Sequence, residues 1–205
     1  MGSILSPVST TAPEVSTFGA GGQMYIASFR GGFNVSSEQV NPLFSFRATD
    51  ESVSNARQLT NLAEALKLGS TMAFRAIKLG VRVISFTNGA LDPDVAANMK
   101  KLLASAEIVI TAGSNDTKIA EFSGMDLMEP VDYVASHATK PSSGAGLGGG
   151  IGWIPLEVPL EFQANCNIGG YVRFTRPVPS NCLPDNGTPT VGFVVILQGL
   201  KVVKS

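Results

Sequence analysis

The chain has 205 residues and a formal net charge of −1, and only 15% of its residues are charged. Charged residues make up about 25% of an average soluble domain, so this surface is poor in charge. The near-zero net charge excludes a strongly basic nucleic-acid binder. A surface with few charges is also poorly protected against association with other chains. These properties suit a subunit of an assembly.

Reactive side chains are few, with one histidine and two cysteines. Histidine-based nucleophilic catalysis needs the base close to a nucleophile. The possible partners of His137 are Ser136, Cys166 and Cys182, but the residues around His137 are typical of a loop edge. We therefore expect no enzyme, no catalytic residue and no cofactor. Two cysteines make no disulfide framework, and we expect free thiols, although a bridge between Cys166 and Cys182 is sterically open.

Two segments have the letters of a ligand-binding motif without its context. Gly144–Gly149 fits the glycine pattern of dinucleotide sites, but such a site needs a preceding strand and a following helix, so we interpret it as a flexible loop. Asp126, Glu129 and Asp132 form an acidic loop cluster whose spacing fits no EF-hand, and we expect a solvated loop without a metal.

Two further short patterns concern partners and location. Arg30-Gly31-Gly32 is a single copy of a motif that binds RNA when repeated, and we interpret it as a turn. Gly2 fits the letters of an N-myristoylation signal, which we interpret as accidental. We expect neither a signal peptide nor a transmembrane segment.

The first half of the chain predicts an arm, two strands and a helix. Residues 1–23 are rich in Ser, Thr, Pro, Gly and Ala, so we expect a flexible arm that orders against a neighbour. A short strand, Met24–Phe29, is stopped by Gly31 and Gly32, and Leu43–Phe46 forms a second strand. A helix opens at Ser54 and ends at Gly69, and its apolar face consists of Leu59, Leu62, Ala63 and Leu66.

The middle of the chain predicts a long strand and a well-capped helix. Over residues 71–87 the alternation of apolar residues changes parity near Ala76 and Ile77, which predicts a bulge or a bend there. Asp92 at the N-cap and Pro93 at the first helical position start a helix that runs to Ala104. Its apolar stripe contains Val95, Met99, Leu102 and Leu103.

The rest of the chain predicts strands separated by loops. Strands at residues 108–111 and 118–122 form a hairpin, and residues 123–150 form a long loop. The strand at 153–162 contains Pro155 and Pro159, so we expect an edge strand or one broken by bulges. A short strand at 171–175 and a closing strand at 190–203 follow. The closing strand is apolar throughout, which predicts burial inside a sheet.

Seven or eight strands with two short inserted helices predict a mainly β fold, a single jelly roll or β-sandwich over residues 24–205. The alternative is an α/β fold. In that case the strands at 71–87 and 108–111 would be parallel neighbours joined by a right-handed crossover.

The whole-chain pattern resembles a jelly-roll coat or minor coat protein of an icosahedral virus, and among these a tailless bacterial one. The resemblance rests on the Ser/Thr/Pro arm, the inserted helix at 92–104, the Gly/Pro-rich loops and the last strand, Val-Val-Ile-Leu-Gln-Gly-Leu-Lys-Val. It implies a homo-oligomeric virion protein, assembled in the host cytoplasm, whose arm and loops contact copies of itself and other virion proteins. A chain of 205 residues holds one sandwich and not two, which leaves its role as major, minor or spike component open.

The alternative function is a carbohydrate- or other ligand-binding β-sandwich of the attachment type. Such a groove needs exposed aromatic side chains, and the candidates for a stacking platform are Trp153 and Tyr171.

Overall fold

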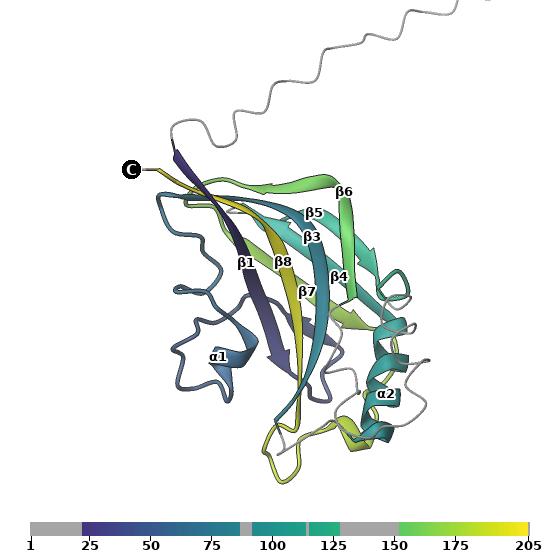
Figure 1. The fold of residues 1–205 in the computed structure, drawn as a ribbon. Helices are drawn as coiled ribbons and strands as arrows, with labels where there is room; N and C mark the ends of the chain where they lie inside the picture. Colours follow the sequence, from purple (N-terminus) through teal and green to yellow (C-terminus); the bar gives the residue numbers. More distant parts are fainter. Residues whose placement is uncertain (1–21, 87–91, 114, 128–151, 205) are drawn as a thin grey trace, which may run out of the picture.

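The computed structural model describes residues 22–86, 92–113, 115–127 and 152–204. In this part of the chain, eight strands form two four-stranded sheets, and every pair of strands is antiparallel (Figure 1). The prediction of a mainly β fold is thereby confirmed. The α/β alternative is wrong, because the strands that follow Thr71 and Ser105 belong to different sheets instead of lying side by side.

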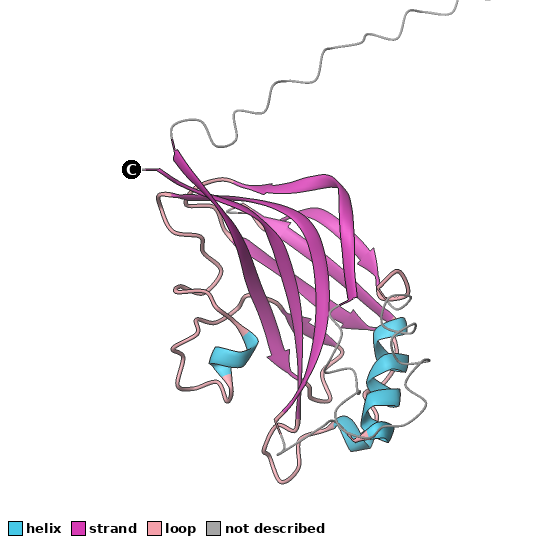
Figure 2. Cartoon of the chain, viewed as in Figure 1, coloured by secondary structure: helices cyan, strands magenta, loops and turns pink. Residues whose placement is uncertain are grey.

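The two sheets differ in strand length. Sheet A has long strands in the order β1 (Gly22–Asn34), β8 (Val191–Lys204), β3 (Met72–Ser85) and β6 (Gly152–Phe162). Sheet B has shorter strands in the order β2 (Val40–Pro42), β7 (Ile168–Phe174), β4 (Ala106–Ala112) and β5 (Thr117–Ser123). The helices α1 (Ala56–Leu59) and α2 (Pro93–Ala104) and the 3-10 turn η1 (Ser180–Cys182) lie outside the sheets (Figure 2).

Apolar side chains from both sheets form one core between them. Its aromatic centre joins the sheets, since Phe33 of β1 packs against Phe193 of β8 at 5.4 Å and against Phe174 of β7 at 6.0 Å between ring centroids. The helix α2 adds Met99 and Leu102 to the same core. A single apolar interior of this kind accounts for the sandwich architecture.

The strand β8 lies inside sheet A, between β1 and β3, and is covered on both faces. Phe193, Val195 and Leu197 point into the core between the sheets. Val194 and Ile196 point to the opposite face, where they pack against Leu59 of α1 in a second apolar cluster. Burial on both faces explains why the sequence of this strand is apolar throughout, and it confirms the prediction of a buried closing strand.

The predicted irregularities in β3 and β6 are present. Between Ala76 and Lys78, β3 shifts its register against both neighbours, so Ile77 is the residue of a bulge. The bulge confirms the predicted change of parity. The strand β6 is the edge of sheet A, and its pairing with β3 jumps from Pro155 to Leu160. Both parts of the prediction for a proline-bearing strand, an edge position and an interruption, are therefore confirmed.

The predicted helix and hairpin in the middle of the chain are also confirmed. The carboxylate of Asp92 accepts hydrogen bonds from the backbone N–H groups of Asp94 (2.8 Å) and Val95 (3.4 Å), and Pro93 begins α2. The strands β4 and β5 pair directly, with Ile108 opposite Phe122.

The prediction that Gly31 and Gly32 stop the first strand is wrong, because β1 continues through them to Asn34. A Cβ atom on Gly31 would lie 2.5 Å from the ring of Phe44, and one on Gly32 would lie 2.5 Å from the carbonyl oxygen of Phe193. These glycines allow close packing within a strand, so the interpretation of residues 30–32 as a turn is wrong as well. At its other end, β1 begins at Gly22, two residues earlier than the predicted domain; residues 1–21 lie outside the described part.

The predictions for residues 43–69 are wrong. The strand of this region is Val40–Pro42 and not Leu43–Phe46. The helix covers only Ala56–Leu59, because the backbone of the following residues bonds to distant partners. The N–H of Leu66, for example, donates to the carbonyl of Phe44 at 2.9 Å, and Leu66 itself has a φ of 58°. Tertiary hydrogen bonds here override an apolar pattern with helical spacing.

Candidate functional site

Most of the residues considered for chemistry lie outside the described part of the chain. These are Gly2, Glu129, Asp132, Ser136, His137 and Gly144–Gly149. Asp126 is described, and it lies exposed in the turn after β5, with its N–H donating to the carbonyl of Ser123 at 3.1 Å. Among the described residues, no three His, Cys, Asp or Glu side chains are grouped so that they would hold a metal ion.

Cys166 and Cys182 are both free thiols, and the contacts of each have a structural role. Cys182 is fully buried in η1, and its burial raises the pKa of the thiol. Because the thiolate is the reactive form, Cys182 is poorly suited to act as a nucleophile. The sulfur of Cys166 accepts a hydrogen bond from the N–H of Gly113 and donates one to the carbonyl of Asn167, each at 3.1 Å. It therefore joins the turn before β7 to the turn after β4.

A cavity of about 390 Å³ lies between the start of α2, η1 and the start of β8. Its volume falls within the range of about 300–1,000 Å³ that small-molecule sites occupy. Two of its polar groups already have structural partners, since Asp92 caps α2 and the amide oxygen of Asn181 accepts from Asn98 at 3.0 Å. The contact between Asn98 and Asn181 joins α2 to η1, so both polar groups have a structural role at this cavity.

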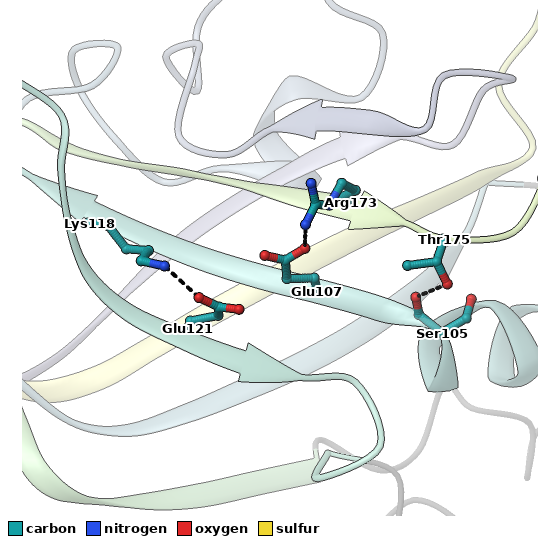
Figure 3. A network of polar contacts seen from close by, with 6 residues as sticks. All are labelled: Ser105, Glu107, Lys118, Glu121, Arg173 and Thr175. Carbon is teal, nitrogen blue, oxygen red and sulfur yellow. Dashed lines mark hydrogen bonds and ion pairs between the residues drawn. The ribbon is translucent and has the colours of Figure 1, made fainter.

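The outer face of sheet B is polar and largely neutralised by its own ion pairs (Figure 3). Arg173 of β7 pairs with Glu107 of β4, and Lys118 pairs with Glu121 within β5 at 2.6 Å. The hydrogen bond and charge of Lys118 lower the pKa of Glu121, and the same contact raises the pKa of Lys118. Exposed pairs of this kind contribute little to the stability of a fold, and the charges on this face are balanced locally.

Part of the outer face of sheet A is apolar and covered. The cluster of Leu59, Val194 and Ile196 lies beneath the segment around α1. Trp153 of β6 packs against this cluster, so its ring is part of an apolar contact instead of a free stacking platform. Tyr171, the other predicted platform, is half-buried on β7, opposite Val109 and Pro42.

Outside the cluster, the first half of β1 exposes three large apolar side chains. Ile26 is 81% exposed, Met24 is 53% exposed and Tyr25 is 48% exposed. Single exposed apolar residues need no explanation, but several at one strand edge indicate an interaction surface. Met24 and Ile26 point to one face of sheet A, and Tyr25 points to the other. We call Met24, Tyr25 and Ile26 the β1 patch. A strand was predicted for these residues from the sequence, whereas their exposure was not.

The second half of the same strand edge is closed by side chains. The amide of Asn61 acts like a neighbouring peptide group: its oxygen accepts from the N–H of Arg30 at 2.7 Å, and its nitrogen donates to the carbonyl of Ser28 at 2.8 Å. The hydroxyl of Thr60 donates to the carbonyl of Arg30 at 2.9 Å. The free edge of β1 therefore begins on the N-terminal side of Ser28, where the β1 patch lies.

Neither family models nor curated proteins supply a function for this chain. No protein-family model matches the chain, and no curated protein matches its sequence. Among the described residues, none of the helices has the length and apolar character needed to cross a membrane.

Proposed function

We propose that the protein is a single jelly-roll subunit of a viral capsid, a structural virion protein that assembles with copies of itself and with other virion proteins. The nested pairing of the strands is the observation that carries this proposal. The strand β1 pairs with β8, β2 with β7, β3 with β6, and β4 with β5. Rolling one long eight-stranded hairpin into two packed sheets produces this pairing, and jelly rolls of capsid and lectin domains have two such Greek keys.

The distribution of polar and apolar surface also supports an assembling subunit. The chain carries few charges, and the outer face of sheet B balances its charges internally. The β1 patch leaves apolar side chains on the surface of the described part. In the proposed subunit, residues 1–21 and the loops make contacts between copies, and the virion assembles in the host cytoplasm. Closed shells form when each copy buries the same complementary patches.

The proposal is tested by examining the purified full chain by negative-stain electron microscopy and light scattering. Closed particles of uniform size are expected. A truncation of residues 1–21 is expected to remain folded, because Gly22, the first residue that pairs with β8, is kept, but to form no particles. Circular dichroism monitors the folding of the truncated chain. A full chain that stays monomeric at all concentrations would contradict the capsid function, and unchanged particles after truncation would contradict the role of the arm.

The second candidate function is carbohydrate binding, because lectin domains also use jelly rolls. Tyr171 is the half-exposed aromatic side chain that favours it. Isothermal titration calorimetry of the chain with simple sugars tests this candidate, because Trp153, the single tryptophan, lies in the other sheet from Tyr171. A saturable heat of binding that the substitution Tyr171→Ala removes would favour the lectin function over the capsid function.

A further inference from the structure

The four edge strands of the two sheets differ in how they are protected against pairing with another chain. Natural proteins protect an exposed edge by short strands, prolines, charges or bulges. The strand β2 is three residues long and contains Pro42, β5 carries Lys118 and Glu121, and β6 contains Pro155 and Pro159. By contrast, residues 22–29 of β1 contain neither a charge nor a proline. The first half of β1 is thus the least protected edge of the described fold.

The backbone of the β1 patch is oriented for pairing. The hydrogen bonds of Ser28 and Arg30 to the side chains of Asn61 and Thr60 show that the main-chain groups of these two residues point away from β8. In an antiparallel ladder this direction repeats at every second residue, and β1 pairs with β8 without a register shift. The N–H and C=O groups of Met24 and Ile26 therefore point to the free edge as well.

We propose that the free edge of β1 pairs antiparallel with the same edge of a second copy, across a twofold axis that passes beside Tyr25. The pairing goes beyond the capsid proposal and does not require it, because it depends only on the edge of sheet A. Two copies of one strand related by a dyad perpendicular to the sheet are antiparallel, and the outward-pointing groups of Met24 and Ile26 in one copy meet those of Ile26 and Met24 in the other.

The side chains select this register. With Tyr25 on the axis, each Ile26 lies opposite a Met24, so the most exposed apolar side chain gains an apolar neighbour. A dyad beside Met24 would instead place Ile26 opposite Gly22. A dyad beside Ile26 would bring the incoming strand against the edge of Arg30, which Asn61 and Thr60 already occupy. The two Tyr25 side chains then face each other as an aromatic cross-strand pair.

The charges near the edge do not oppose a second copy as the partner. The nearest charged side chain on the neighbouring strand is Lys201, which lies 5.9 Å from the centre of the Tyr25 ring. In the pair of copies, the two β8 strands are separated by three strand spacings, or about 14 Å. This separation exceeds the Debye length of about 8 Å at physiological ionic strength, so repulsion between the two lysines is screened. The paired edge of five residues, 23–27, buries less than the roughly 1,000 Å² of a stable interface, so we expect a weak, concentration-dependent contact.

A disulfide trap tests the inference in the full chain. In the proposed register the two Tyr25 residues form a pair without mutual hydrogen bonds, whose Cα atoms lie about 4.5 Å apart, within the range that a disulfide spans. The substitution Tyr25→Cys is expected to give a covalent dimer on mild oxidation. The matched control is Val158→Cys, which places a thiol at a 76% exposed site on the protected strand β6. The unsubstituted chain gives the background from Cys166 and Cys182.

The second variant tests the role of the patch. Adding Ile26→Lys to the Tyr25→Cys chain is expected to reduce the covalent dimer to the level of the Val158→Cys control, whereas adding Val158→Lys leaves it unchanged. Equal cross-linking of Tyr25→Cys and Val158→Cys would overturn the inference. Equal cross-linking is also expected if residues 1–21 occupy the edge, because the thiol introduced at position 25 would then not meet the same thiol of a second copy. Electron microscopy reports on the capsid proposal separately, so a chain that cross-links without forming particles retains the strand pairing and loses the capsid function.

Discussion

Gly199 of β8 lies directly against the main-chain carbonyl of Arg75 on β3. A Cβ atom built on Gly199 would come within 1.8 Å of that oxygen, a distance that no pair of non-bonded atoms adopts. The contact occurs where Ala76 pairs with Gly199, immediately before the bulge at Ile77. A residue without a side chain at this position is therefore what allows β8 and the bulged β3 to stay hydrogen-bonded.

The substitution Gly199→Ala is predicted to destabilise the fold strongly. Overpacking in a well-packed interior costs about 1–3 kcal/mol, and here the clash is with backbone, which cannot rotate away. Urea unfolding followed by circular dichroism measures the loss. Gly69→Ala is the control, because the nearest atoms to its Cβ lie 3.9 Å away. A similar loss of stability in both variants would show that the contact with Arg75 is not the cause.

The cap of α2 leads to a second prediction. Asp92→Ala removes the acceptor for the N–H groups of Asp94 and Val95, and loss of an N-cap destabilises a protein by about 1 kcal/mol. Asp92→Asn keeps an acceptor oxygen and is expected to lose much less. Thermal unfolding of the two variants compares them. If Asn were as damaging as Ala, the charge at the helix N-terminus, and not the hydrogen bond, would be the stabilising factor.

Local patterns in the sequence predicted the elements whose contacts are local or repeat along one strand. The parity change at Ala76 marked the bulge of β3, and Asp92 with Pro93 marked the start of α2. The prolines of residues 153–162 marked β6 as an interrupted edge. In each case the signal lies within the element itself, so it can be read without the rest of the fold.

The sequence did not predict features that depend on distant residues. Gly31 looks like the end of a strand until Phe44 is placed against it. Leu66 fits a helical stripe until its N–H is seen to bond to Phe44. The β1 patch was missed for a related reason, since only the order of strands in sheet A decides that β1 is an edge. The sequence does show that residues 22–29 lack charge and proline. This absence indicates an unprotected edge only once β1 is known to be an edge strand.

The two cysteines are predicted to differ in reactivity. Burial raises the pKa of the Cys182 thiol above its ordinary value of 9.0, whereas Cys166 is partly exposed. A thiol reagent at pH 8 is expected to modify Cys166 in the folded chain and Cys182 only after unfolding. A Cys166→Ala chain should therefore react slowly until denaturant is added. Fast reaction of that variant under native conditions would mean that η1 opens readily.

The raised pKa of Cys182 also gives a sign for the dependence of stability on pH. The folded state holds the proton more tightly than the unfolded state, so this group's contribution is complete well below pH 9. It is lost as the pH rises through the unfolded pKa toward the folded one. Urea unfolding at pH 7 and pH 10 measures the loss, and Cys182→Ala should reduce its size. An unchanged pH dependence in that variant would assign the effect to other groups.

The side-chain amide of Asn61 is predicted to protect the edge of β1 against pairing with another chain and to stabilise the fold. Asn61→Ala removes the hydrogen bonds to Arg30 and Ser28, each of which contributes about 0.5–1.5 kcal/mol, with the lower end expected for an exposed side chain. The same change frees the carbonyl of Ser28 and the N–H of Arg30, while Thr60 still bonds to the carbonyl of Arg30. The free edge of β1 therefore lengthens from the β1 patch to Ser28, so we expect greater self-association. Urea unfolding and sedimentation velocity measure the two effects. Asn98→Ala is the matched control, since it removes one exposed side-chain hydrogen bond, from the amide of Asn98 in α2 to Asn181. If both variants associate equally, the side chain of Asn61 does not limit pairing at the edge.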